Sequence, residues 1–201
     1  MEKYLSSTIQ GIIDVTLPMV LITVVVAVLL RLTYLIKNKM HITLYKELFM
    51  LTFIIYILCL FQVVTIQDTV SWSSNNFIPF KEILRYDFGS HLFMRNVIGN
   101  VLLFIPFGYF VSYILDNKKI YLPLLITFIT SLTIEFVQLS IGRVFDVDDV
   151  ILNLIGGSIG FLIYYIFTSI WDRLPKIFKN EIVLDILSVI LLSIVIYIFM
   201  F

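Results

Sequence analysis

Four charged side chains lie close together in the sequence, around the junction of two strongly apolar segments: Glu135, Arg143, Asp146 and Asp149. A carboxyl group held among apolar residues can serve as a general acid or base. A guanidinium group binds a phosphate or carboxylate through two parallel hydrogen bonds, and aspartate oxygens are ligands that Mg²⁺ accepts. We therefore take these four residues as the candidate catalytic set, with Asp146 and Asp149 as candidate magnesium ligands.

Four amide side chains accompany the charged residues as candidate binding residues. Asn96 and Asn100 are four positions apart, so they share one face of a helix, and Asn153 follows the last aspartate at the same spacing. Gln138 extends a polar stripe that also contains Glu135. Amides in apolar helices also stabilise helix–helix contacts, so a purely structural role is the alternative for Asn96 and Asn100.

Glu135 is the most informative of these residues because it lies inside an apolar helix. It is about six residues, or roughly 9 Å, from the predicted helix end. An acidic side chain at depth costs about 2.5–3.5 kcal/mol on insertion scales, so we expect Glu135 to face the bundle interior and to pair with Arg143. A structural ion pair is the alternative, and the aspartates can also serve as caps of the next helix.

The composition places these residues in a membrane protein. Of 201 residues, 60% are hydrophobic and 14% are charged, whereas a water-soluble domain carries about 25% charged residues. The 14 Lys and Arg residues balance the 14 Asp and Glu residues and form no basic tract, which excludes a nucleic-acid-binding protein. The single cysteine, Cys59, excludes a disulfide framework and a zinc finger within one chain.

Six apolar segments are long enough to cross a bilayer, whose hydrocarbon core of about 30 Å requires roughly 20 apolar residues in a helix. Backbone polar groups in lipid must be hydrogen-bonded within their own segment, so these segments are predicted to be helices. The prediction is an all-α integral membrane bundle of five to six transmembrane helices. The predicted segments are residues 15–36, 48–66, 96–115, 120–141, 150–170 and 182–201.

The distribution of basic residues predicts the orientation of the bundle. With six spans, nine of the 14 Lys and Arg residues fall in the connections on one side, and nine of the 14 Asp and Glu residues fall on the other. The basic side is therefore predicted to be cytoplasmic. Both termini and the charged residues around Glu135 then lie on the extracytoplasmic side of a multi-pass cell-membrane protein.

The long connection between the second and third segments, residues 67–95, has a distinctive composition. Apolar residues recur there at helical spacing, opposite charged residues, after a proline that interrupts regular structure. This pattern predicts a short amphipathic helix that lies in the membrane–water interface. The residues concerned are Pro79, Phe80, Ile83, Leu84 and Phe88.

Polar, glycine and proline residues in the middle of the chain form one extended pattern. Its members are Asn76, Pro79, Phe80, Asn96, Gly99, Asn100, Phe104, Ile105, Pro106, Phe107, Gly108, Glu135, Gln138, Arg143, Asp146, Asp149, Asn153, Gly156, Gly157 and Gly160. This pattern resembles the VanZ-like family. The resemblance covers residues 48–170 as a core; residues 1–47 would add a transmembrane helix and a basic cytoplasmic loop, and residues 171–201 a cytoplasmic loop and a last transmembrane helix.

The resemblance implies a membrane protein of a Gram-positive bacterium. It implies a role in low-level resistance to the glycopeptide teicoplanin or in modification of the cell envelope. The partners it implies are a membrane lipid or lipid-linked envelope precursor and the glycopeptide antibiotic itself.

Two other functions remain open at the level of sequence. The first is a membrane-embedded enzyme that acts on a lipid-linked phosphate or a phospholipid, with Glu135 as general acid or base and Arg143 as the anion-binding group. The second is an ion-coupled transporter that uses Glu135 as a relay, which is less favoured because the sequence contains no internal repeat. Gly156 and Gly160 predict close helix packing, within one chain or between two, so the oligomeric state stays open.

Overall fold

The computed structural model describes residues 2–66, 75–116 and 118–200 of the chain. These residues form helices joined by turns, and six of the helices are long and apolar enough to cross a membrane. Within the described ranges no strand is present, apart from an isolated parallel bridge between Asn76 and Asp146. The prediction of an all-α multi-pass membrane protein is confirmed.

The chain separates into two compact units, and the first contains Met1–Gln62 together with Pro175–Phe201. Its long helices are α1 (Glu2–Lys37), α7 (Glu181–Met200) and most of α2 (Leu44–Ile66). An ion pair links the end of α1 to the beginning of α2. In it, the guanidinium group of Arg31 donates to both carboxylate oxygens of Glu47, at 2.8 and 3.0 Å.

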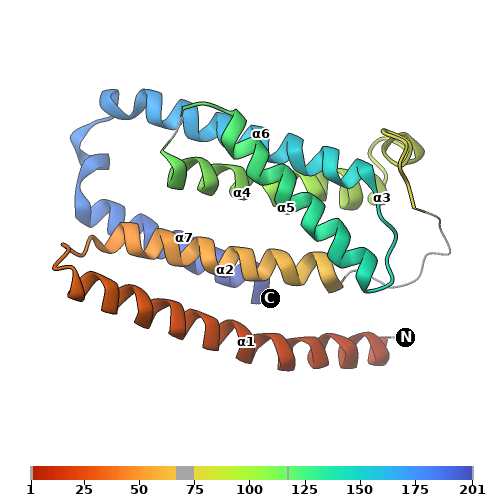
Figure 1. Ribbon diagram of the computed structural model, residues 1–201, viewed down its shortest axis with the longest axis horizontal. Coiled ribbons are helices and arrows are strands. Elements are labelled where there is room, and N and C mark those ends of the chain that lie inside the picture. Colours follow the sequence, from red (N-terminus) through yellow and green to blue (C-terminus); the bar gives the residue numbers. More distant parts are fainter. Residues whose placement is uncertain (1, 67–74, 117, 201) are drawn as a thin grey trace. The chain divides into compact units, whose positions relative to one another are not determined.

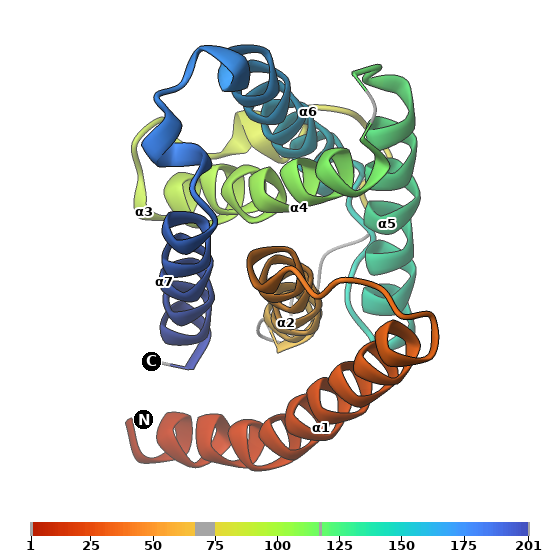
Figure 2. The same cartoon turned by 90° about the vertical axis from the view of Figure 1, so that its left-hand side faces the viewer.

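The second unit, Val63–Leu174, contains all the candidate site residues. Its long helices are α4 (Gly99–Leu115), α5 (Tyr121–Ser140) and α6 (Val147–Ile170). These three helices lie side by side, and α6 packs along α4 and against α5 (Figures 1 and 2). The short elements of this unit are η1 (Ile83–Arg85), α3 (His91–Phe93), η2 (Met94–Ile98, a π-helical turn) and η3 (Trp171–Arg173). One further short element, η4 (Lys176–Lys179), belongs to the first unit.

Glycines allow α4 and α6 to approach each other at backbone distance. A Cβ atom added to Gly108 would lie 2.7 Å from the Cα and carbonyl carbon of Gly157. A Cβ atom added to Gly160 would lie 2.7 Å from the backbone nitrogen of Tyr109. Gly156 meets the backbone of α4 in the same way at Val101. The Gly156–Gly160 pair therefore packs α6 against α4 within one chain.

Two helices begin earlier than the segments predicted from apolar composition, although the candidate span Pro18–Lys37 agrees with the predicted residues 15–36. The first helix begins at Glu2 rather than at residue 15, and the third span begins at His91 rather than at residue 96. Apolar composition locates the part of a helix that lies in lipid, whereas the helical hydrogen bonds continue into the polar residues at either end.

The amphipathic helix predicted after Pro79 is also different in the structure. Turns lead into a single 3₁₀ turn, η1, instead of a continuous α-helix. Phe80 has a left-handed backbone conformation, with φ of 66°, which interrupts a right-handed helix at the point where the prediction began. The backbone N–H groups of this segment bond to a side chain of α6, as described below.

Candidate functional site

The candidate site lies where α5 turns into α6. Asp146 is the N-cap of α6, and its side chain accepts a hydrogen bond from the N–H of Asp148 at 2.9 Å. The link between the helices is held at its other end by the N–H of Arg143, which donates to the carbonyl oxygen of Gln138 at 2.9 Å. Capping of this kind satisfies N–H groups that the first helical turn leaves without a partner. The turn therefore has a defined geometry rather than being a free loop.

Glu135 faces the interior of this unit, as predicted. Its side chain is 1% exposed, and Oε2 accepts a hydrogen bond from the backbone N–H of Asp146 at 2.9 Å. Arg143 lies within electrostatic range of Glu135 and also of Asp149. The sequence predicted that Arg143 pairs with Glu135. In the structure the guanidinium group acts electrostatically on both Glu135 and Asp149.

Asp149 connects α6 to α4. Its Oδ1 atom accepts a hydrogen bond of 2.6 Å from the side-chain amide of Asn100. The charges of Glu135 and Asp146 also act on this carboxylate. The structure therefore brings the four charged candidates into one group, which we call the polar cluster: Glu135, Arg143, Asp146 and Asp149.

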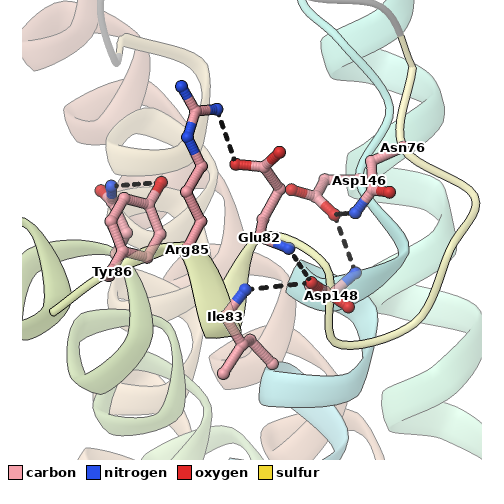
Figure 3. A network of polar contacts seen from close by, with 8 residues as sticks. Asn76, Glu82, Ile83, Arg85, Tyr86, Asp146 and Asp148 are labelled. Carbon is pink, nitrogen blue, oxygen red and sulfur yellow. Dashed lines mark hydrogen bonds and ion pairs between the residues drawn. The ribbon is translucent and has the colours of Figure 1, made fainter. Parts of the chain in front are cut away.

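Asn76, from the connection before α3, completes the surroundings of Asp146. Its amide nitrogen donates to Oδ1 of Asp146 at 2.9 Å, as Figure 3 shows. Its backbone pairs with both neighbours of that aspartate: N–H donates to the carbonyl of Phe145 at 2.8 Å, and its carbonyl accepts from the N–H of Val147 at 3.0 Å. Burial raises the pKa of Asp146, although the hydrogen bonds from Asp148 and Asn76 act in the opposite direction.

Two of the other candidate binding residues, Asn96 and Asn153, bond to side chains outside the polar cluster. The amide of Asn96 donates to the hydroxyl oxygen of Tyr86 at 3.0 Å, and the amide of Asn153 donates to Oγ of Ser131 at 2.9 Å. Gln138 is buried in α5. Asn100 bonds directly to a member of the polar cluster, Asp149.

Asp148 is the residue whose role the sequence did not reveal. Its side chain is 1% exposed, and its two oxygens accept hydrogen bonds from three backbone N–H groups, those of Phe80, Glu82 and Ile83. Figure 3 shows the contacts with Glu82 and Ile83. Helical spacing puts Asp148 on a different face of α6 from Asp149, and no local signal connects it to residues more than 60 positions earlier. Because these N–H groups bond to Asp148, the segment forms turns instead of the predicted helix.

A comparison with protein-family models identifies the relationship of the chain. The model described as VanZ/LLP1 matches residues 48–168, more than half of the chain. The chain belongs to the VanZ/LLP1 family. No curated protein and no solved structure matches it. The matched residues of this VanZ/LLP1 protein include the whole polar cluster, its amide neighbours and Asp148.

The magnesium site predicted for this VanZ/LLP1 protein has no complete ligand set. Among the described residues, no group of three or more His, Cys, Asp and Glu side chains is placed to hold a metal ion. Oδ1 of Asp146 already accepts hydrogen bonds from Asn76 and Asp148, donors that a cation would have to displace. The donor set does not fit Mg²⁺, so no chemical step is assigned to a metal here.

Proposed function

We propose that this VanZ/LLP1 protein acts in the bacterial cell envelope on a membrane lipid or a lipid-linked envelope precursor, and that it lowers susceptibility to the glycopeptide teicoplanin. The polar cluster is its functional site in this proposal. The family assignment supports the envelope role, and the excess of basic residues in the opposite connections supports an extracytoplasmic position for the cluster.

One observation carries the proposal: three carboxylates and an arginine converge at one end of the helices α5 and α6. Capping of α6 explains Asp146, and contact between α6 and α4 explains Asp149. Neither explains why Glu135 is buried inside a membrane-spanning helix. Acidic side chains in such helices are costly, and they mark functional sites by default.

Arg143 indicates the chemical class of the ligand. A guanidinium group suits a phosphate or carboxylate, the groups that phospholipids, lipid-linked precursors and peptide termini carry. The surrounding carboxylates favour an amine or a hydroxyl on the same ligand, because each can donate hydrogen bonds to them. A headgroup with both kinds of group therefore matches the polar cluster.

An enzymatic role for the same site is the second candidate. Glu135 is buried and lies within electrostatic range of Arg143, which would place a general acid or base beside an anion-binding group. In this version the protein transforms the lipid instead of only binding it. Lipid analysis of cells that carry wild-type protein or Glu135→Gln would reveal a product that depends on the carboxyl group.

The proposal can be tested by teicoplanin susceptibility in a sensitive Gram-positive host. The host expresses the wild-type protein, Glu135→Gln, Asp149→Asn or the control Glu181→Gln, which changes an exposed carboxylate at the start of α7. Membrane abundance is matched before susceptibility is measured. We expect protection from the wild type and the control, and loss of protection in both cluster variants.

Two other outcomes would contradict the proposal. No protection from the wild-type protein would remove the teicoplanin role and leave the family assignment unaffected. Equal protection from wild type and both cluster variants would mean that the polar cluster is not the functional site.

A further inference from the structure

Residues 77–88, here called the aromatic loop, expose large apolar side chains. Phe88 is 92% exposed and Leu84 is 81% exposed. Phe77, Ile78 and Phe80 are each more than half exposed. Isolated apolar residues are common on protein surfaces, but five on one short segment require an explanation.

The backbone of the central part of this loop donates its hydrogen bonds within the protein. From Ile78 to Arg85 each N–H group has a protein acceptor, Pro79 having no N–H to donate. The side-chain oxygens of Asp148 accept from Phe80, Glu82 and Ile83, and that of Asn76 accepts from Ile78. Carbonyl oxygens within the loop accept from Lys81, Leu84 and Arg85.

This combination distinguishes an apolar environment from an aqueous one. Water would satisfy the N–H groups of an exposed loop, so a loop in water needs no internal acceptors. In an apolar medium, an N–H group without a partner costs roughly 2–7 kcal/mol. A buried carboxylate with three N–H partners removes that penalty from the loop, while the apolar side chains remain on its outside.

The aromatic loop also continues directly into a membrane-spanning segment. The candidate span His91–Leu115 begins three residues after the loop, and its first turns expose Leu92 and Met94. The rings of Phe88 and Phe93 lie 5.1 Å apart, so the exposed apolar surface of the loop joins that of the span. The exposed apolar surface of the loop is therefore continuous with that of a helix apolar enough to cross a membrane.

We propose that the aromatic loop inserts its apolar side chains into the interfacial region of the lipid bilayer, with Asp148 holding the backbone in the inserted form. The charged residues of the loop fit the same location. Lys81 and Arg85 place basic groups at headgroup depth, and Arg85 is paired with Glu82 at 3.2 Å. Such interfacial segments combine aromatic and apolar residues with basic ones. This inference does not depend on the ligand of the polar cluster.

The depth of the loop can be measured with fluorescent probes on the full-length protein in lipid nanodiscs. In a Cys59→Ser background, cysteines introduced as Leu84→Cys and Phe88→Cys carry an environment-sensitive fluorophore, and Asn38→Cys in the α1–α2 turn is the control. Lipids with a nitroxide near the headgroup are the membrane quencher, and iodide is the aqueous quencher. Both native side chains are exposed, so these substitutions leave the fold intact.

We expect the probes at 84 and 88 to show blue-shifted emission, loss of fluorescence with nitroxide lipid and protection from iodide. The control probe should behave in the opposite way. Quenching of the loop probes by iodide alone would place the loop in water and overturn the proposal. Protection from both quenchers would mean that another protein surface covers the loop, which would overturn it equally.

The role of Asp148 requires a separate variant. Asp148→Asn removes the charge and one acceptor oxygen, so amide hydrogen exchange of residues 80–83 should accelerate and nitroxide quenching at residue 88 should weaken. Glu181→Gln is the matched control and should change neither measurement. Unchanged exchange and quenching in Asp148→Asn would show that this carboxylate does not hold the inserted loop.

Discussion

Three carboxylates around the start of α6 each have an identified hydrogen-bond donor. Glu135 accepts from the N–H of Asp146, Asp149 from the side chain of Asn100, and Asp148 from three backbone N–H groups. Because these donors come from different parts of the chain, each contact can be removed separately. At the scale of single residues, the support of each carboxylate can therefore be tested by itself.

Asn100→Ala tests the support of Asp149. Removal of the amide takes away the donor of a half-buried carboxylate oxygen, and a hydrogen bond of this kind typically contributes about 0.5–1.5 kcal/mol to stability. We expect a lower melting temperature for the purified protein in detergent. Thr133→Ala is the control, since the Thr133 hydroxyl donates to its own helix at an exposed position. Equal melting temperatures for the two variants would contradict a stabilising role for the Asn100–Asp149 contact.

The raised pKa of Asp146 predicts a pH dependence of stability. A carboxyl group with a higher pKa in the folded state holds its proton more tightly there than in the unfolded chain. Its contribution to stability is fully present below the ordinary aspartate pKa of about 3.9 and is lost as pH rises through the raised value. Asp146→Asn lacks this titration. As pH increases across that range, the melting temperature of the wild type should therefore fall relative to that of the variant. A constant difference would contradict this prediction.

At the scale of the elements, the contact between α4 and α6 fixes the frame of the site. Backbone meets backbone at Gly108 and Gly157, so neither helix can rotate without a steric clash. Asn100 on α4 and Asp149 on α6 are held opposite each other by this packing. The distance between the Asn100 and Asp149 side chains therefore depends on the packing of Gly108 against Gly157, within the membrane-spanning parts of the two helices.

Gly108→Ala should separate the two helices. The added methyl group would lie 2.7 Å from the carbonyl carbon of Gly157, and overpacking of this kind typically costs about 1–3 kcal/mol. We expect a lower melting temperature and weaker function in the susceptibility assay. Gly99→Ala is the control in the same helix, because its Cβ would make an ordinary 3.7 Å contact with the Met94 carbonyl. If both variants match the wild type, the close approach is not required.

The elements also show what sequence patterns can and cannot predict. The long helices were predictable because a run of about 20 apolar residues has few alternatives in a membrane protein. The grouping of Glu135, Asp146 and Asp149 followed from helical spacing and a short link. The shape of the aromatic loop did not, because Asp148 accepts its N–H groups across at least 65 residues of sequence. Local periodicity carries no information about a partner so distant.

At the scale of the whole molecule, the proposed orientation places the polar cluster outside the cell. Ser140 at the end of α5 should then be accessible in intact cells, whereas Asn38 between α1 and α2 should not. In a Cys59→Ser background, a membrane-impermeant thiol reagent should label Ser140→Cys directly and Asn38→Cys only after permeabilisation. The reverse labelling pattern would place the cluster in the cytoplasm and remove the basis for an extracellular glycopeptide role.

The long-range contact of Asp148 has a consequence for biosynthesis. Ile83 leaves the ribosome 65 residues before Asp148, an interval of about 3–13 s at ordinary rates of translation. During that time the N–H groups of residues 80, 82 and 83 lack the acceptor that they have in the complete fold. The proposed insertion of the loop with its N–H groups bonded to Asp148 therefore follows the synthesis of the first turn of α6. The aromatic loop therefore reaches its final hydrogen bonding only when the start of α6, which follows it in the chain, is also in place.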